Sequence, residues 1–147
     1  MTGAGRGHGR VAALDLGSRR IGVAYSDSAR SLASPWGMIA RSGDPVRDRS
    51  AVVDAVREVE ATTVVVGLPL SLSGDVGPAA KAALEETAAL RAVLEPLGVA
   101  VETADERFTT VEAQRALRAA GRSGKAARAV VDSAAAMVLL QSWLDNA

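Results

Sequence analysis

The chain has 147 residues, and its 17 Lys and Arg balance 17 Asp and Glu, so the formal net charge is zero. This length predicts one domain, and 48% hydrophobic residues suffice for one core. The absence of cysteine excludes disulfides, a thiol nucleophile and thiolate–zinc sites. The single histidine, His8, lies in a glycine-rich leader, which excludes a histidine-based catalytic triad. Hydrolytic chemistry would therefore rest on carboxylates, hydroxyls, basic side chains or a metal ion.

The N-terminal segment 1–9, MTGAGRGHG, is predicted to be a disordered leader ahead of a single domain over 10–147. It is too polar to be a signal peptide, and no apolar run approaches the roughly 20 residues that span a bilayer. We therefore expect a cytoplasmic protein with no membrane partner.

The first half of the chain begins with two strands, 10–16 and 20–25, joined by a hairpin turn at Gly17-Ser18-Arg19. A third, short strand is predicted over 36–40. Asp44 as N-cap and Pro45 at the first position predict a helix over 46–60.

The remaining segments alternate between strands and helices. The β-branched run 62–66 predicts a strand buried on both faces. After it we expect a loop over 67–77, a helix over 78–97 ended by Gly98, a strand over 99–103, a helix over 109–120 and a last helix over 125–144. This order predicts an α/β fold with a mixed sheet: an antiparallel strand meander followed by β–α crossovers, with helices on both faces.

One carboxylate, Asp15, ends the most apolar strand of the chain. A charge in such a strand costs several kcal/mol unless it is paired or ligated. A turn aspartate that accepts hydrogen bonds from the backbone of Gly17 and Ser18 is an equally good interpretation of this residue alone.

Three further acidic residues stand out, two of them directly after a strand and the third in the last helix. Asp105 and Glu106 come after the strand 99–103, at the sheet edge where ligands of open α/β sheets collect, although either residue would also serve as a helix cap. Asp132 lies beside the apolar face of the last helix, where pairing with Arg128 is the alternative. Converging carboxylates repel one another, and a hard cation such as Mg²⁺ or Mn²⁺ relieves that repulsion and activates water for attack on a phosphate.

Basic residues gather in the segment 107–128, which contains six of them against one acid, Glu112. Arg115, Arg118 and Arg122 share one face of the helix predicted over 109–120. Phosphate contacts or an ordinary solvated surface both account for this face. The arginines of the first hairpin would project near the same end of the sheet.

Four segments together resemble the YqgF/RuvX family: VAALDLGSRRIGVAYSD (11–27), VVVGLPLSLSG (64–74), DERFTTVEA (105–113) and VVDSAAAMVLLQSWLD (130–145). The resemblance implies a ribonuclease H-like fold and a metal-dependent phosphodiesterase that uses Mg²⁺ or Mn²⁺. It implies that Asp15, Glu106 and Asp132 are the catalytic and metal-binding acids, with Asp105 as an additional candidate. The candidate substrate-binding residues are Arg19, Arg20, Arg107, Thr109, Thr110, Arg115, Arg118, Arg122 and Arg128.

The resemblance further implies a nuclease that processes the 5′ end of precursor 16S rRNA during ribosome biogenesis, with precursor rRNA and ribosomal particles as partners. The alternatives are a Holliday junction resolvase acting on branched DNA, and a non-catalytic RNA-binding assembly factor. An actin-like nucleotide-binding protein is disfavoured, because its site needs a second domain. We expect a monomer rather than a homodimer, since no stretch indicates a dimer interface.

Overall fold

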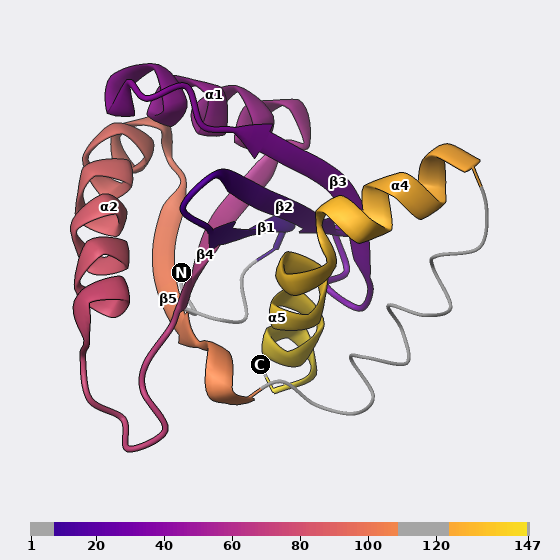
Figure 1. Cartoon of the computed structure of the whole chain (residues 1–147). Coiled ribbons are helices and arrows are strands. Elements are labelled where there is room, and N and C mark those ends of the chain that lie inside the picture. The colour runs from indigo at the N-terminus through magenta and orange to yellow at the C-terminus, as the bar shows by residue number, and fades with distance from the viewer. Residues whose placement is uncertain (1–7, 109–123, 147) are drawn as a thin grey trace.

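The computed structural model describes residues 8–108 and 124–146. Its centre is a five-stranded sheet in the order β3-β2-β1-β4-β5 (Figure 1). The first three strands are antiparallel, whereas β4 and β5 run parallel to β1. The strands are β1 (Arg10–Leu16), β2 (Arg20–Ser26), β3 (Ala33–Ala40), β4 (Ala61–Leu68) and β5 (Ala100–Asp105).

Helices cover both faces of this sheet, because both faces are apolar. The helices α1 (Pro45–Glu58) and α2 (Pro78–Leu94) pack on one face, where Val56 and Leu90 meet Leu14 and Val64. The helices α4 (Gly124–Asp132) and α5 (Ala134–Asp145) pack on the other (Figure 1). The predicted mixed sheet with a meander, crossovers and helices on both faces is thus confirmed.

Local signals in the sequence define several element ends. The Asp44 side chain accepts hydrogen bonds from the backbone N–H groups of Val46 and Arg47, and so caps α1 as expected. The chain after α2 continues as a short 3₁₀ helix, η1 (Glu95–Leu97). Gly98 then ends this turn in the left-handed conformation at φ 84°.

The last helix differs from its prediction, because the expected helix over 125–144 is broken at Ser133. Ser133 has φ −115° and ψ 16°, and its hydroxyl donates to the carbonyl of Ala129. A serine that bonds back to the preceding turn bends a helix, and here α4 and α5 run in different directions (Figure 1). Asp132 therefore stands at a junction between two helices rather than inside one.

Two other boundaries were also predicted differently. The third strand begins at Ala33 rather than at Trp36, since Ala33 to Ser34 also pair with β2. The strand β5 extends to Asp105, so this residue ends the strand instead of following it. The helix predicted over 109–120 lies outside the described residues.

His8 and Gly9, which the sequence assigned to the leader, are held against the start of β4. The carbonyl of His8 accepts hydrogen bonds from the Thr62 hydroxyl at 2.8 Å and from Arg30 at 3.2 Å. Arg30 also donates to the carbonyl of Gly9 at 2.9 Å. These two residues therefore belong to the folded part of the chain. No helix within the described ranges is long and apolar enough to cross a membrane.

Candidate active site

Strand alternation places Asp15 on the sheet face that α5 covers. Val11 and Ala13 of β1 pack in the core beneath Leu140 of α5, and Asp15 follows at the same two-residue spacing. Its antiparallel partner on β2 is Gly22. Asp15 is half-buried, and its neighbour on this side has no side chain to cover it.

Glu106 reaches the same face from the far side of β4. It begins the short 3₁₀ helix η2 (Glu106–Phe108), directly after β5. The parallel pairing sets Gly67 of β4 opposite Ala104, and a Cβ on Gly67 would lie 3.0 Å from Cγ of Glu106 and 3.0 Å from Leu139 Cδ2. The glutamate side chain thus occupies the space that the glycine leaves open.

The carboxyl groups of Asp15 and Glu106 come together across Gly67. Burial, the charge of Asp15 and a hydrogen bond with Asp15 together raise the pKa of Glu106 from 4.5 to about 7. The charge of Asp105 acts in the same direction. A carboxyl group that is half protonated at neutral pH, beside a second carboxylate in a partly buried site, is characteristic of functional centres.

Asp132 lies beside this pair of carboxyl groups, and its main chain packs against Gly22, the β2 partner of Asp15. The last residue of α4 is half-buried, and its carbonyl oxygen lies 3.3 Å from the position of a Cβ on Gly22. Within the described ranges, no three His, Cys, Asp or Glu side chains lie close enough to hold one ion. The structure therefore joins two of the predicted acids and sets the third beside them.

Asp105 is paired with an arginine rather than with the other acids. Arg107 donates from Nε to both of its oxygens, at 3.1 and 2.9 Å, and from a terminal nitrogen at 2.6 Å. These hydrogen bonds lower the pKa of Asp105. Arg107 also donates to the carbonyl of Leu72 at 3.1 Å, so the pair fastens the loop after β4 to the edge of the site.

The other candidate substrate-binding residues fall into two groups. Arg19 in the first hairpin, Arg20 at the start of β2 and Arg128 on α4 are exposed. Five candidates lie outside the described residues, namely Thr109, Thr110, Arg115, Arg118 and Arg122.

Two glycines, Gly22 and Gly67, are site residues whose position beside the carboxylates the sequence reasoning did not predict. They flank Asp15 on both sides of β1: Gly22 is its partner on β2, and the pairing of Leu14 with Val66 makes Gly67 the next neighbour on β4. Their absent side chains admit the main chain of Asp132 and the carboxyl group of Glu106. A glycine inside a strand often marks such a close approach, and this was the available signal.

Replacing Gly67 by alanine should lower any activity of this site by about 10- to 100-fold, because the new methyl group displaces Glu106. The free energy of unfolding should fall by only about 1–3 kcal/mol, which is typical of overpacking. Gly77→Ala is the matched control, since a Cβ there meets nothing within 4 Å. Enzyme kinetics and thermal melting measure both effects, and equal activity of the two variants would contradict this role of Gly67.

The mixed five-stranded sheet in the order β3-β2-β1-β4-β5, with helices on both faces, defines a class, namely proteins of ribonuclease H-like fold. RuvC of Thermus thermophilus in complex with a Holliday junction substrate has a similar fold, with a TM-score of 0.58 over 89% of this chain and 92% of that chain, at 14% identity. A second structure of Thermus thermophilus RuvC gives 0.53, over 90% of this chain and 92% of that one. At this identity the likeness concerns the fold.

The chain belongs to the RuvX family, described as "RuvX: Holliday junction resolvase", whose model matches residues 9–146. A relative from Mycobacterium sp. (strain KMS) is 46% identical over 140 residues, covering 95% of this chain and 82% of its own length. A relative from Rhodococcus opacus (strain B4) is 46% identical over 143 residues, covering 95% and 79%. Each relative is named "Putative pre-16S rRNA nuclease". The family is thus one of nucleases, which hydrolyse phosphodiester bonds.

Proposed function

We propose that this chain is a metal-dependent nuclease that trims the 5′ end of precursor 16S rRNA in the cytoplasm, as a monomer. The observation that carries the proposal is the meeting of Asp15 and Glu106 at the carboxyl edge of the parallel strands, with the pKa of Glu106 raised to about 7. The names of the relatives from Mycobacterium and Rhodococcus support precursor rRNA as the substrate.

The donor set fits a hard divalent cation such as Mg²⁺ or Mn²⁺. Both groups are oxygen donors, and their mutual repulsion is the kind that a cation relieves. Asp15 and Glu106 would hold the ion, and Asp132 is proposed as a further ligand from the other side of Gly22. A bound divalent ion supplies Lewis acidity, which activates water and neutralises the charge that develops on the phosphate.

Residues of the chain have three further proposed roles: holding negative charge at the site, positioning the loop after β4, and contacting phosphates. Ionised Asp15 and Glu106 hold negative charge at the site, and the proton that Glu106 carries at low pH must leave before both can act as ligands. Asp105 is proposed as a positioning residue, because its three hydrogen bonds orient Arg107 and, through Leu72, the loop after β4. Arg19, Arg20 and Arg128 are proposed to contact phosphates outside the reacting group.

Holliday junction cleavage is the second candidate function. The description of the family model and the fold of RuvC bound to a junction favour it. A resolvase that nicks two symmetric strands would be expected to act as a dimer. The two functions therefore differ both in substrate and in oligomeric state.

A side-by-side cleavage assay should show selective cutting of a precursor 16S rRNA 5′ fragment over a four-way DNA junction, with either Mg²⁺ or Mn²⁺ present. The expected preference for RNA is at least about tenfold in kcat/KM, which corresponds to about 1.4 kcal/mol. Paired symmetric nicks in the junction, with dimers in solution, would instead establish the resolvase. Binding of the RNA without cleavage would leave a non-catalytic assembly factor as the better description.

A further inference from the structure

The loop after β4, residues 69–77, is braced by hydrogen bonds among its own polar groups. The hydroxyl of Ser71 accepts from the backbone N–H of Asp75 at 3.1 Å, and the Ser71 N–H donates to the Asp75 carbonyl at 3.1 Å. The Ser73 hydroxyl donates to the Asp75 carboxylate at 2.8 Å. Gly74 permits the turn with its φ of 88°, and its N–H donates to the carbonyl of Ser71 at 2.8 Å. The tip of the loop therefore has a defined shape.

This loop is also fastened to the edge of the candidate active site. It extends beyond the sheet at the end where η2 lies (Figure 1). Arg107, which follows Glu106, donates to the carbonyl of Leu72 at 3.1 Å. Leu72 is five residues from Gly67, a span of at most about 18 Å. A stacked strand advances about 3.4 Å per nucleotide, so Leu72 lies within about five nucleotides of the carboxylates.

Leu72 is an apolar side chain that the braced loop leaves in water. It is 95% exposed, the largest exposed fraction among the large hydrophobic residues of the described ranges. Val76, on the returning limb of the same loop, is 55% exposed. A single exposed leucine on an arbitrary surface needs no explanation. This one stands on a braced loop at the rim of a site for nucleic acid, so it is placed to meet the substrate.

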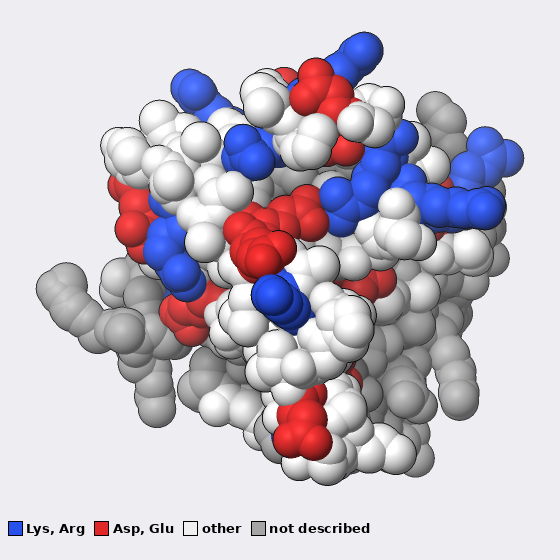
Figure 2. All heavy atoms as spheres, turned by 60° about the vertical axis from the view of Figure 1, so that its left-hand side comes forward, with Lys and Arg blue, Asp and Glu red and all other residues white. Residues whose placement is uncertain are grey.

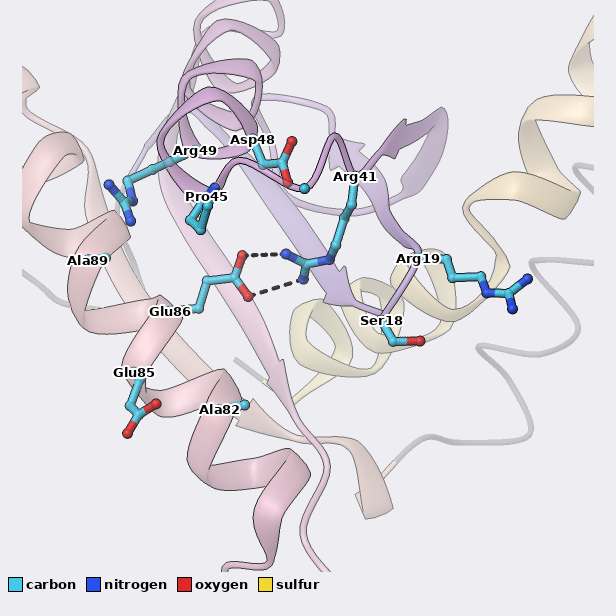
Figure 3. A pocket seen from close by; sticks show the side chains of 11 residues that line it. Ser18, Arg19, Arg41, Pro45, Asp48, Arg49, Ala82, Glu85, Glu86 and Ala89 are labelled. Atoms are coloured by element: carbon cyan, nitrogen blue, oxygen red, sulfur yellow. Dashed lines mark hydrogen bonds and ion pairs between the residues drawn. The ribbon is translucent and has the colours of Figure 1, made fainter.

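The surroundings of Leu72 differ from the charged surface around the first hairpin. In Figure 2 the Lys and Arg side chains gather in the upper part of the face, whereas the loop after β4 lies at its lower end, where most of the described side chains are uncharged. Near the hairpin, Arg41 donates to both carboxylate oxygens of Glu86, at 3.0 and 3.1 Å (Figure 3). Beside the loop, Arg107 is paired with Asp105. The tip of the loop thus suits the apolar face of a nucleobase better than a phosphate.

We infer that Leu72 packs against the face of one unpaired nucleobase of the substrate, within about five nucleotides of the scissile bond. The bases of a continuous duplex are stacked on both faces, so this contact requires a strand end, a loop or a base that has left the stack. The inference rests on the proposed nuclease function and adds a requirement for its substrate. Leu72 is accordingly a specificity-determining residue and takes no part in the chemistry at the phosphate.

Abasic substitution in the precursor 16S rRNA 5′ fragment tests this contact. One base at a time is removed on either side of the scissile bond, and kcat/KM is measured for the wild type and Leu72→Ser. At one position, loss of the base should lower kcat/KM of the wild type about tenfold and leave that of Leu72→Ser nearly unchanged, because the variant has no contact left to lose. Leu72→Phe should keep the wild-type pattern.

The matched control is Leu97→Ser, which should also keep the wild-type pattern. Leu97 is 51% exposed and precedes the start of β5, whereas Glu106 follows the end of this strand. Equal losses at every position in the wild type and Leu72→Ser, with cleavage intact, would overturn the base contact and leave the nuclease standing. A defect of Leu72→Ser that appears with precursor ribosomal particles and not with the RNA alone would also overturn it, and would assign Leu72 to a protein partner.

A second measurement is independent of cleavage and uses 2-aminopurine, placed in the RNA at each of these positions. This base fluoresces weakly while it is stacked on its neighbours. Binding by the wild type should raise its fluorescence about twofold or more at one position, and Leu72→Ser should lose that rise. That result without any cleavage would support the contact and refute the nuclease. Equal fluorescence with the wild type and Leu72→Ser at every position would refute the contact.

Discussion

Asp15→Asn should lower kcat for phosphodiester cleavage by about 10³-fold or more, equivalent to about 4 kcal/mol of transition-state stabilisation. The amide has the size of the carboxyl group but carries no charge, so the site loses the acid that stands between Gly22 and Gly67 on β1. Folding should survive, because the substitution also removes the repulsion between Asp15 and Glu106.

The measurement compares single-turnover cleavage and thermal melting for the wild type, Asp15→Asn and the surface control Asp54→Asn. Asp54 is exposed on α1, on the opposite side of the sheet, so the control should keep its activity. Full activity in Asp15→Asn would refute the catalytic role of this carboxylate. A melting temperature well below that of the wild type would instead make Asp15 a structural residue.

Glu106→Gln should stabilise the metal-free protein at pH 8 relative to the wild type, by about 1–2 kcal/mol. The pKa of Glu106 is raised from 4.5 to about 7 in the folded chain, so between these values the folded state binds more protons than the unfolded state. Stability therefore falls as pH rises through this window. A full shift of this size corresponds to about 3.4 kcal/mol, and the partial exposure of the group reduces it through solvent screening.

Urea unfolding at pH 4 and pH 8 measures this effect, with Glu85→Gln on the exposed side of α2 as the control. The wild type and Glu106→Gln should differ little at pH 4 and diverge by pH 8. Because a metal ligand must be deprotonated, the apparent affinity of the wild type for Mg²⁺ should also rise with pH, by up to tenfold per unit below about pH 7. A pH-independent difference between the two proteins would show that Glu106 does not titrate in this range.

The sequence predicted the framework of this fold well, because that framework depends on local signals. Asp44 and Pro45 mark the start of α1, and Gly98 ends the turn after α2. The β-branched run of β4 is buried on both faces from Thr63 to Val66, although its first residue, Thr62, is exposed. The position of Asp15 at the end of an apolar strand was also visible. Each of these features involves residues that are neighbours in the chain.

What the sequence did not predict depends on strand pairing and on local hydrogen bonds that the residue pattern does not reveal. The helix break at Ser133 has a local hydrogen bond, but the periodicity of 125–144 continues through it. Gly22 and Gly67 matter only because strand pairing sets them on either side of Asp15. Asp105 was a candidate fourth acid, yet its pairing with Arg107 follows from how η2 turns after β5.

The hydrogen bonds that Arg30 donates to the carbonyls of His8 and Gly9 have a practical consequence for handling this protein. They hold these carbonyls near Thr62, where β1 and β4 begin, whereas Asp15 and Gly67 lie near the other ends of these strands. A fluorophore or surface linker attached ahead of His8 is thereby anchored at the sheet end remote from the carboxylates. The immobilised protein would then present the sheet edge that carries Asp15 and Glu106 outward, and single-molecule traces could be recorded without the tether covering that edge.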